Sequence, residues 1–263
     1  ELFSENNITN GLGNLIVGYQ EPRSDDGNEA TVDTNDRSGS HNIVVGKGNN
    51  YSMWGGMLVG WRNTVSEFLS SVGGGFNNGI YGRHSTIGGG YSNRVAGAGM
   101  CTIGGGALNR AEAVGATVAG GTGNVASGEV SAVGGGGGNT ASGINATVSG
   151  GRSNEASGER STVGGGYECF ARGESSTISG GQSNQADGRS ATLGGGFGNV
   201  SGGDYSTVGG GWRNQAIVRL AHFSTIGGGN ENVIRGEYST IGGGSGNSLG
   251  NREGLWVGGG IDE

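Results

Sequence analysis

The chain has 263 residues, of which 66 are glycine and one is proline, and its formal net charge at pH 7 is −7. Abundant glycine without abundant proline or a three-residue period excludes a collagen triple helix. The 15 Lys and Arg residues are scattered along the sequence, which disfavours nucleic acid as a partner. No stretch approaches the roughly 18 apolar residues of a membrane-spanning helix, so we expect no membrane insertion by this segment.

The beginning of the chain is irregular, and we predict that residues 1–50 form an N-terminal cap with irregular first coils, as solenoids require. Looser forerunners of the later repeat occur at Val17, Val45 and Val59. Residues 21–40 are polar and acidic and too long for a tight corner. This composition favours a solvated loop, with a calcium site as the alternative. The carboxylates concerned are Asp25, Asp26, Glu29, Asp33 and Asp36.

Residues 51–263 carry a regular repeat in which Ser-Thr-Ile/Val-Gly-Gly-Gly is followed by Asn and then Ala. The apolar residue recurs every 15 residues, apart from two steps of 16 and one of 18. A fixed period of this size indicates one structural unit that is wound repeatedly and stacked on itself. The apolar position holds Val72, Ile87, Ile103, Val118, Val133, Val148, Val163, Ile178, Leu193, Val208, Ile226, Ile241 and Val257.

Each repeat predicts one coil with two short strands. Alternation places Ser161 and Val163 on the inner side of a strand and Thr162 on the outer side. A second apolar position, Ala171 in this repeat, follows eight residues after the valine. The two apolar positions face each other across a narrow core. We therefore predict an all-β fold, a parallel β-roll or β-solenoid with about 15 residues per coil.

Glycine and asparagine mark the corners of the coil. The second and third positions after the apolar residue are always Gly, which indicates positive φ or no room for a Cβ. Asn recurs six residues after the apolar position, where stacked side chains can form an amide ladder. We favour this structural role over ligand binding. The ladder residues are Asn78, Asn93, Asn109, Asn124, Asn139, Asn154, Asn184, Asn199, Asn214, Asn232 and Asn247.

The two cysteines replace repeat residues. Cys101 occupies the small Ser/Ala position, and Cys169 occupies the Asn position. Four coils of about 4.8 Å each separate them. This exceeds the under ~7 Å between α-carbons that a disulfide needs, so we expect no bond between them.

A row of threonines precedes the apolar residue in ten of the eleven coils from Ile87 to Ile241, with Ala132 as the exception. Stacked Thr side chains suit the outer surface of a sheet. An ice-binding surface is the alternative, although such surfaces usually need two parallel Thr rows. A Thr and Gly face without bulk also allows close approach of a partner subunit.

Aromatic residues recur at a corner, four residues after the apolar position. They can stack on sugar rings or pack between subunits, and packing is the simpler interpretation. The positions are Phe76, Tyr91, Tyr167, Phe197 and Trp212.

The coil after Trp212 contains the insertion that produces the step of 18 residues. Its apolar side chains on a polar coil predict burial against a partner, so we expect a contact surface here. These residues are Ile217, Val218, Leu220 and Phe223.

Nothing in the sequence indicates catalysis. The histidines, His41, His84 and His222, lie in distant coils, and no Cys/His group has zinc-ligand spacing. Glycine-rich matches to nucleotide motifs are not followed by a helix. We predict a protein that is not an enzyme and has no cofactor and no metal.

The N-terminal motifs resemble those of a known family. Residues 10–18 read NGLGNLIVG, residues 39–46 read GSHNIVVG and residues 55–64 read GGMLVGWRNT. They resemble the left-handed β-roll family that includes the heads of trimeric autotransporter adhesins, and more closely the glycine-rich bacterial surface proteins. The resemblance implies left-handed coils and a homotrimer.

Together, these features predict a non-enzymatic adhesive or structural rod of a bacterial surface protein, located outside the cell. It would present multivalent binding surfaces to a glycan or to a host or matrix ligand. The alternatives are a phage or injection-system tail-fibre module that binds or cleaves surface glycans, and an ice-binding protein. Because the chain begins at Glu1 and ends within a coil at Glu263, we expect it to be part of a longer protein.

Overall fold

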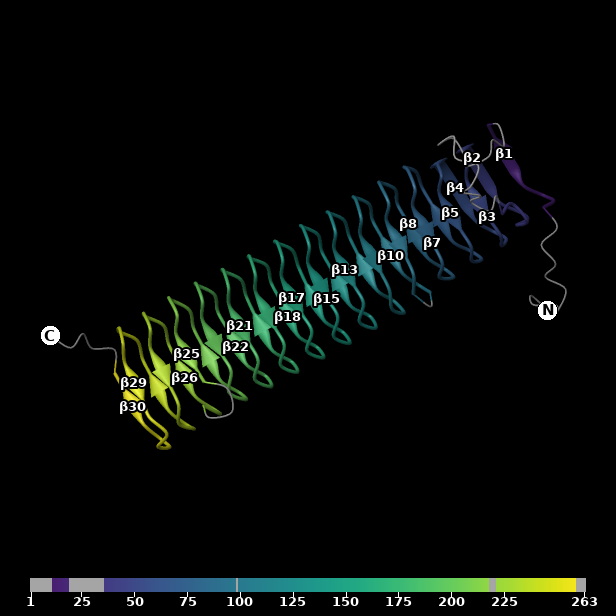
Figure 1. Ribbon diagram of the computed structural model, residues 1–263. Coiled ribbons are helices and arrows are strands. Elements are labelled where there is room, and N and C mark those ends of the chain that lie inside the picture. The colour runs from purple at the N-terminus through teal and green to yellow at the C-terminus, as the bar shows by residue number, and fades with distance from the viewer. Residues whose placement is uncertain (1–10, 19–35, 98, 218–220, 259–263) are drawn as a thin grey trace, which may run out of the picture. The chain divides into compact units, whose positions relative to one another are not determined.

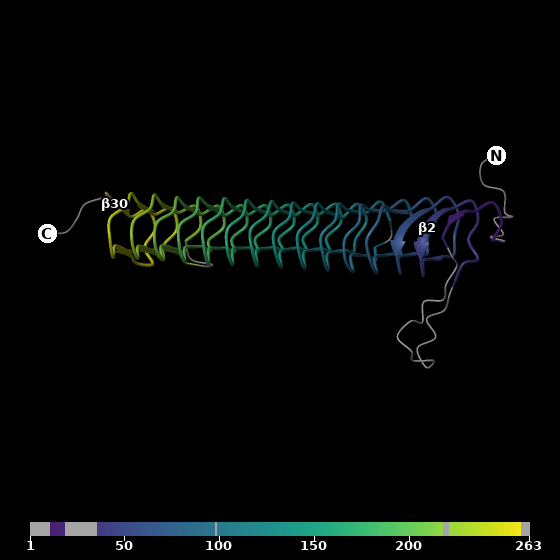
Figure 2. The same ribbon diagram turned by 90° about the horizontal axis from the view of Figure 1, so that it is seen from above.

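The computed structural model describes residues 11–18, 36–97, 99–217 and 221–258, and in this part of the chain it contains strands and no helix (Figure 1). The predicted fold class is confirmed: the chain is an all-β parallel β-solenoid with about 15 residues per turn and two short strands per coil. It divides into two compact units, Glu1–Gly123 and Asn124–Glu263. Within each unit, successive coils lie side by side (Figures 1 and 2).

The first unit contains two parallel sheets. Strands of one sheet come from the first half of each coil, and strands of the other come from the second half. The first sheet consists of β1 (Leu15–Val17), β2 (Ile43–Lys47), β4 (Met57–Trp61), β6 (Ser71–Val72), β8 (Thr86–Ile87), β10 (Thr102–Ile103) and β12 (Thr117–Val118). The second sheet consists of β3 (Asn50–Tyr51), β5 (Thr64–Val65), β7 (Gly79–Ile80), β9 (Arg94–Val95) and β11 (Arg110–Ala111).

The second unit repeats this arrangement with greater regularity. Its first-sheet strands are β14 (Ala132–Val133), β16 (Thr147–Val148), β18 (Thr162–Val163), β20 (Thr177–Ile178), β22 (Thr192–Leu193), β24 (Thr207–Val208), β26 (Thr225–Ile226), β28 (Thr240–Ile241) and β30 (Trp256–Val257). Its second-sheet strands are β13 (Val125–Ala126), β15 (Thr140–Ala141), β17 (Glu155–Ala156), β19 (Phe170–Ala171), β21 (Gln185–Ala186), β23 (Val200–Ser201), β25 (Gln215–Ala216), β27 (Val233–Ile234) and β29 (Ser248–Leu249).

The core is one side chain deep from each sheet. In a typical strand the first residue points outward and the second is fully buried, as in Thr162 and Val163. The register pairs Val163 with Ile178 in the first sheet and Ala156 with Ala171 in the second. Burial of each Val or Ile contributes about 1.5–3 kcal/mol. The coil is therefore stabilised by a stack of equivalent apolar residues.

The early coils are displaced by one residue from the sequence prediction. Val45 and Val59 were expected at the inward position, but the register aligns Val44 and Leu58 with the inward Val72. These coils are one residue shorter between the inward side chain and the glycine of the corner. An alignment on the glycines therefore moves the predicted apolar residue by one, and a shift of one residue in a strand exchanges its two faces. The same correction replaces Val17 by Ile16, which pairs with Val44.

The glycine at the third position after the inward apolar residue is required for both of the reasons that the sequence suggested, as Gly151 in the coil of Val148 shows. Gly151 has φ +86°, and a Cβ there would lie 2.2 Å from the backbone oxygen of Gly166 in the next coil. The preceding residue differs. A Cβ on Gly150 would meet no atom within 4 Å, so the coil itself does not exclude a side chain at this position.

The division at residue 50 stays a prediction, and most of the acidic stretch, including Asp25, Asp26 and Asp33, lies outside the described residues. The described part of the chain contains no helix long and apolar enough to span a membrane.

Candidate functional site

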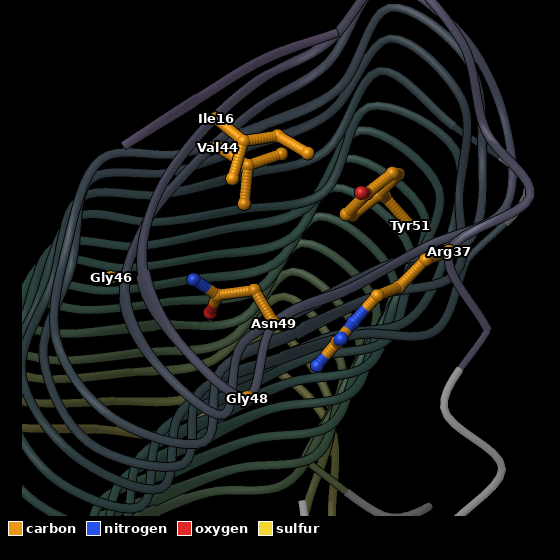
Figure 3. Close-up of a pocket in the computed structure, with 7 residues that line it drawn as sticks. All are labelled: Ile16, Arg37, Val44, Gly46, Gly48, Asn49 and Tyr51. Atoms are coloured by element: carbon orange, nitrogen blue, oxygen red, sulfur yellow. The ribbon is translucent and has the colours of Figure 1, made fainter. Parts of the chain in front are cut away.

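The cavity within the first coils is too small for an organic ligand. At the N-terminal end of the first unit, a cavity of about 10 Å³ is lined by residues that include Ile16, Val44 and Tyr51 (Figure 3). This volume corresponds to about one water molecule. Burial raises the pKa of the Tyr51 phenol, an effect that the positive charge of Arg37 partly opposes. Within the described residues, no group of three or more His, Cys, Asp or Glu side chains could hold a metal ion.

The buried thiols are unsuited to nucleophilic chemistry. Cys101 and Cys169 are free and fully buried. Burial raises the pKa of both thiols, although hydrogen bonds with neighbouring groups partly oppose this effect. A buried thiol that stays protonated near neutral pH is a poor nucleophile.

The asparagine side chains form hydrogen bonds that tie each coil to its neighbours. The amide of Asn154 donates to the carbonyl oxygens of Gly150 and Gly166, both at 2.9 Å. Its backbone N–H donates to the side-chain oxygen of Asn139 at 3.0 Å. The side chain is buried, and its hydrogen-bonding groups are used within the solenoid. These contacts favour the structural role that we predicted over ligand binding.

The first unit presents a row of aromatic rings at one corner, in which the two outer rings are exposed and the Phe76 ring between them is half-buried. The ring centroids of Trp61 and Phe76 are 4.7 Å apart, and those of Phe76 and Tyr91 are 5.7 Å apart. Trp61 is 44% exposed and Tyr91 is 51% exposed. Parallel bridges join these residues from coil to coil, so the repeat aligns the rings. We call Trp61, Phe76 and Tyr91 the first aromatic row.

The second unit has a shorter row at the equivalent corner. Phe197 and Trp212 stack with centroids 4.3 Å apart, and the guanidinium of Arg213 lies 5.6 Å from the Trp212 ring. Tyr167 is exposed but is not part of this stack, because Gln182 occupies the coil between it and Phe197. Of the predicted aromatic contact residues, Phe76 and Tyr91 thus stack in the first unit, and Phe197 and Trp212 stack in the second.

Another aromatic row, which sequence reasoning missed, occupies a different corner of the second unit. Tyr205, Phe223 and Tyr238 stack almost in parallel, with centroids 4.9 Å and 5.2 Å apart. Their exposure lies between 41% and 58%. All three lie three residues before the inward apolar residue and have positive φ, an uncommon conformation for aromatic residues. Their spacing of 18 and 15 residues was the signal in the sequence.

Phe223 thus belongs to this row and not to the surface around Trp212. Of the other predicted insertion residues, Val218 and Leu220 lie outside the described residues. Ile217 is half-buried, and its N–H donates to the carbonyl oxygen of Ile234 at 3.0 Å. Ala221 is buried at the corner, where the neighbouring coils have glycine.

The threonine row forms a single file on the first sheet of each unit. Thr162 pairs in register with Thr177, and both are half-exposed. In the second unit, the outward residues of the second sheet are mixed, for example Glu155, Phe170 and Gln185. The described part of this unit therefore lacks the second parallel Thr row that ice binding usually needs.

Comparison with known proteins gives no further assignment: no protein-family model matches the chain, and no curated protein sequence matches it.

Proposed function

We propose that this chain is a non-enzymatic adhesive module of a bacterial surface protein that acts outside the cell. The observation that carries the proposal is the set of exposed aromatic stacks at the corners of the coils, such as the first aromatic row. Exposed aromatic rings that lie together mark binding surfaces, since Trp and Tyr contribute strongly to recognition. The resemblance of the N-terminal motifs to bacterial surface proteins agrees with this function.

Repetition supports a multivalent mode of binding. Each stack presents similar rings at the spacing of the coils, so one extended ligand can contact several of them. Weak contacts that engage together raise the overall affinity without requiring a deep pocket. We propose a surface glycan, or a glycosylated host or matrix protein, as the partner.

We further propose that the chain acts as a homotrimer with left-handed coils. The resemblance of the N-terminal motifs to the family that includes trimeric adhesin heads supports the trimer. The mass in solution tests this proposal, and a monomer at all concentrations would refute it.

Binding of the whole chain to a panel of immobilised neutral and acidic glycans tests the adhesive function. We expect the double variant Phe76→Ala and Tyr91→Ala to lose most of the signal. Leu108→Ala is the matched control, since Leu108 is 53% exposed in the same unit and belongs to no ring stack. Equal signals from both variants would refute the role of the first aromatic row. Thermal hysteresis without glycan binding would instead favour ice binding.

A further inference from the structure

A polar cavity of about 240 Å³ lies beside the first aromatic row in the first unit. Two successive coils form it, and its lining residues follow Phe76 and Tyr91 directly in the chain. They are Asn77, Gly79, Tyr81, Ser92, Asn93 and Arg94. The cavity is therefore next to the surface on which we place the glycan.

Gly79 determines the shape of this cavity. In the second sheet, its neighbours in register are Thr64 and Arg94, which have side chains. The Tyr81 ring occupies the space that Gly79 leaves, since a Cβ on Gly79 would lie 2.9 Å from a ring carbon. The guanidinium of Arg94 lies over the same ring, 4.8 Å from its centroid. The glycine thus allows the tyrosine to position the arginine.

Arg94 has no carboxylate partner among the described residues, and this distinguishes it from the next arginine in the sheet. Arg110 pairs in register with Arg94 but forms an ion pair with Glu112 at 2.5 Å. Arg94 is exposed at the cavity, and its guanidinium carries donors in a planar arrangement that suits an anionic oxygen group.

The other polar groups of the cavity can bind neutral hydroxyls. The amide of Asn77 donates to the Ser92 hydroxyl at 3.1 Å, so the Ser92 hydroxyl can still donate and the Asn77 carbonyl can accept. The amide of Asn93 is different, because it donates to the carbonyl oxygens of Gly89 and Gly106. Asn93 therefore contributes to the wall of the cavity and not to recognition.

The charge of the described residues in the first unit favours an anion. They contain six Lys and Arg residues and three Asp and Glu residues, although the whole chain is acidic. A local excess of positive charge raises the concentration of anions near the surface and their rate of association.

We propose that this cavity binds the charged unit of an anionic saccharide, with Arg94 holding its carboxylate or sulfate ester. Asn77, Ser92 and the Tyr81 hydroxyl bind the sugar hydroxyls, and adjacent sugar units extend over Phe76 and Tyr91. This assignment rests on the proposed adhesive function and specifies the class of its ligand.

Isothermal titration calorimetry of the whole chain tests the assignment, with trigalacturonate as the probe. Its methyl ester, which has the same backbone without the charge, is the matched ligand control. A sulfated galactose trisaccharide tests the second source of the anion. We expect Arg94→Gln to weaken binding of the preferred anionic probe at least about tenfold. The wild type should bind the methyl ester about as weakly as Arg94→Gln binds the anionic probe. Arg110→Gln, the matched protein control, changes the affinity less than about twofold.

Gly79→Val gives a second route to the same site, because the added side chain displaces the Tyr81 ring. We expect a loss similar to that of Arg94→Gln, with circular dichroism to verify the fold of both variants. If Gly79→Val does not fold, the exposed Arg94 carries the test alone.

Equal losses in Arg94→Gln and Arg110→Gln would overturn the assignment, as would equal affinity for trigalacturonate and its ester or no binding of either anionic probe. The glycan panel separates this failure from failure of the adhesive function. If neutral glycans bind and Tyr91→Ala abolishes their binding, the adhesive function holds without the anion site. If the panel shows no binding at all, both proposals fail.

Discussion

The adjacent glycines Gly150 and Gly151 differ in whether the coil has room for a Cβ, and an alanine substitution at each of them tests how the coils are stacked. We expect Gly151→Ala to be strongly destabilising. At φ +86°, a residue with a Cβ in the left-handed region costs about 1–2 kcal/mol. The Cβ would also lie 2.2 Å from the oxygen of Gly166 and 2.6 Å from the amide nitrogen of Asn154. Relieving such crowding costs about 1–3 kcal/mol more, so the total is about 2–5 kcal/mol.

Gly150→Ala is the matched control, because its Cβ meets no atom within 4 Å. We expect its stability to lie within about 0.5 kcal/mol of the wild type. Urea denaturation followed by circular dichroism measures both variants. For an m-value of about 2 kcal/mol/M, Gly151→Ala lowers the midpoint by about 1–2.5 M while Gly150→Ala leaves it nearly unchanged. Equal midpoints would refute the proposed stacking of the corners.

Three further predictions follow from the buried polar groups. Asn154→Ala removes the donors to two carbonyl oxygens and the acceptor for the Cys169 N–H. Urea denaturation should therefore show a free energy of unfolding that is lower by about 2–5 kcal/mol. A decrease of less than about 1 kcal/mol would contradict the structural role of the asparagine ladder. The Ser161 hydroxyl is buried without a hydrogen-bond partner, whereas the Ser224 hydroxyl donates to the Gly236 carbonyl oxygen at 2.9 Å. In thermal melts, Ser161→Ala should therefore be neutral or stabilising, and Ser224→Ala should lower the free energy of unfolding by about 1 kcal/mol. The reverse order would be inconsistent with this packing. Burial raises the pKa of both thiols above the usual 9.0, so the unfolded chain loses these protons at a lower pH than the folded chain. The free energy of unfolding should therefore fall as the pH rises through about 9, by at most about 1.4 kcal/mol per pH unit for each thiol. Cys101→Ala should reduce that fall in denaturation at several pH values, and an unchanged slope would show that the thiol does not contribute.

The fold was predictable because the period fixes the register. Once Val163 and Ala171 are placed inward, a repeat of 15 residues stacks each on its equivalent in the next coil. The prediction was wrong at Val45 and Val59, where the coils are shorter. Glycine spacing alone cannot show on which side of the corner a residue has been lost.

The candidate surfaces were only partly predictable. The aromatic positions at one corner repeat at the period and were found, but the row of Tyr205, Phe223 and Tyr238 was not. Its position also accommodates His84, Met100 and Val130, so no residue type marks it. The cavity at Arg94 depends on a missing side chain at Gly79 and on a tyrosine two residues later. Such a combination becomes visible only when two coils are placed together.

If the stacked corner aromatics contact the ligand, the fluorescence of Trp61 reports that contact most directly. The triple variant Trp54→Phe, Trp212→Phe and Trp256→Phe leaves Trp61 as the one tryptophan of the chain. Titration of this variant with the soluble form of the glycan that gives the strongest panel signal should change its emission saturably, at the concentrations at which calorimetry detects binding. Binding by calorimetry with no change in Trp61 emission would contradict the claim for the first aromatic row.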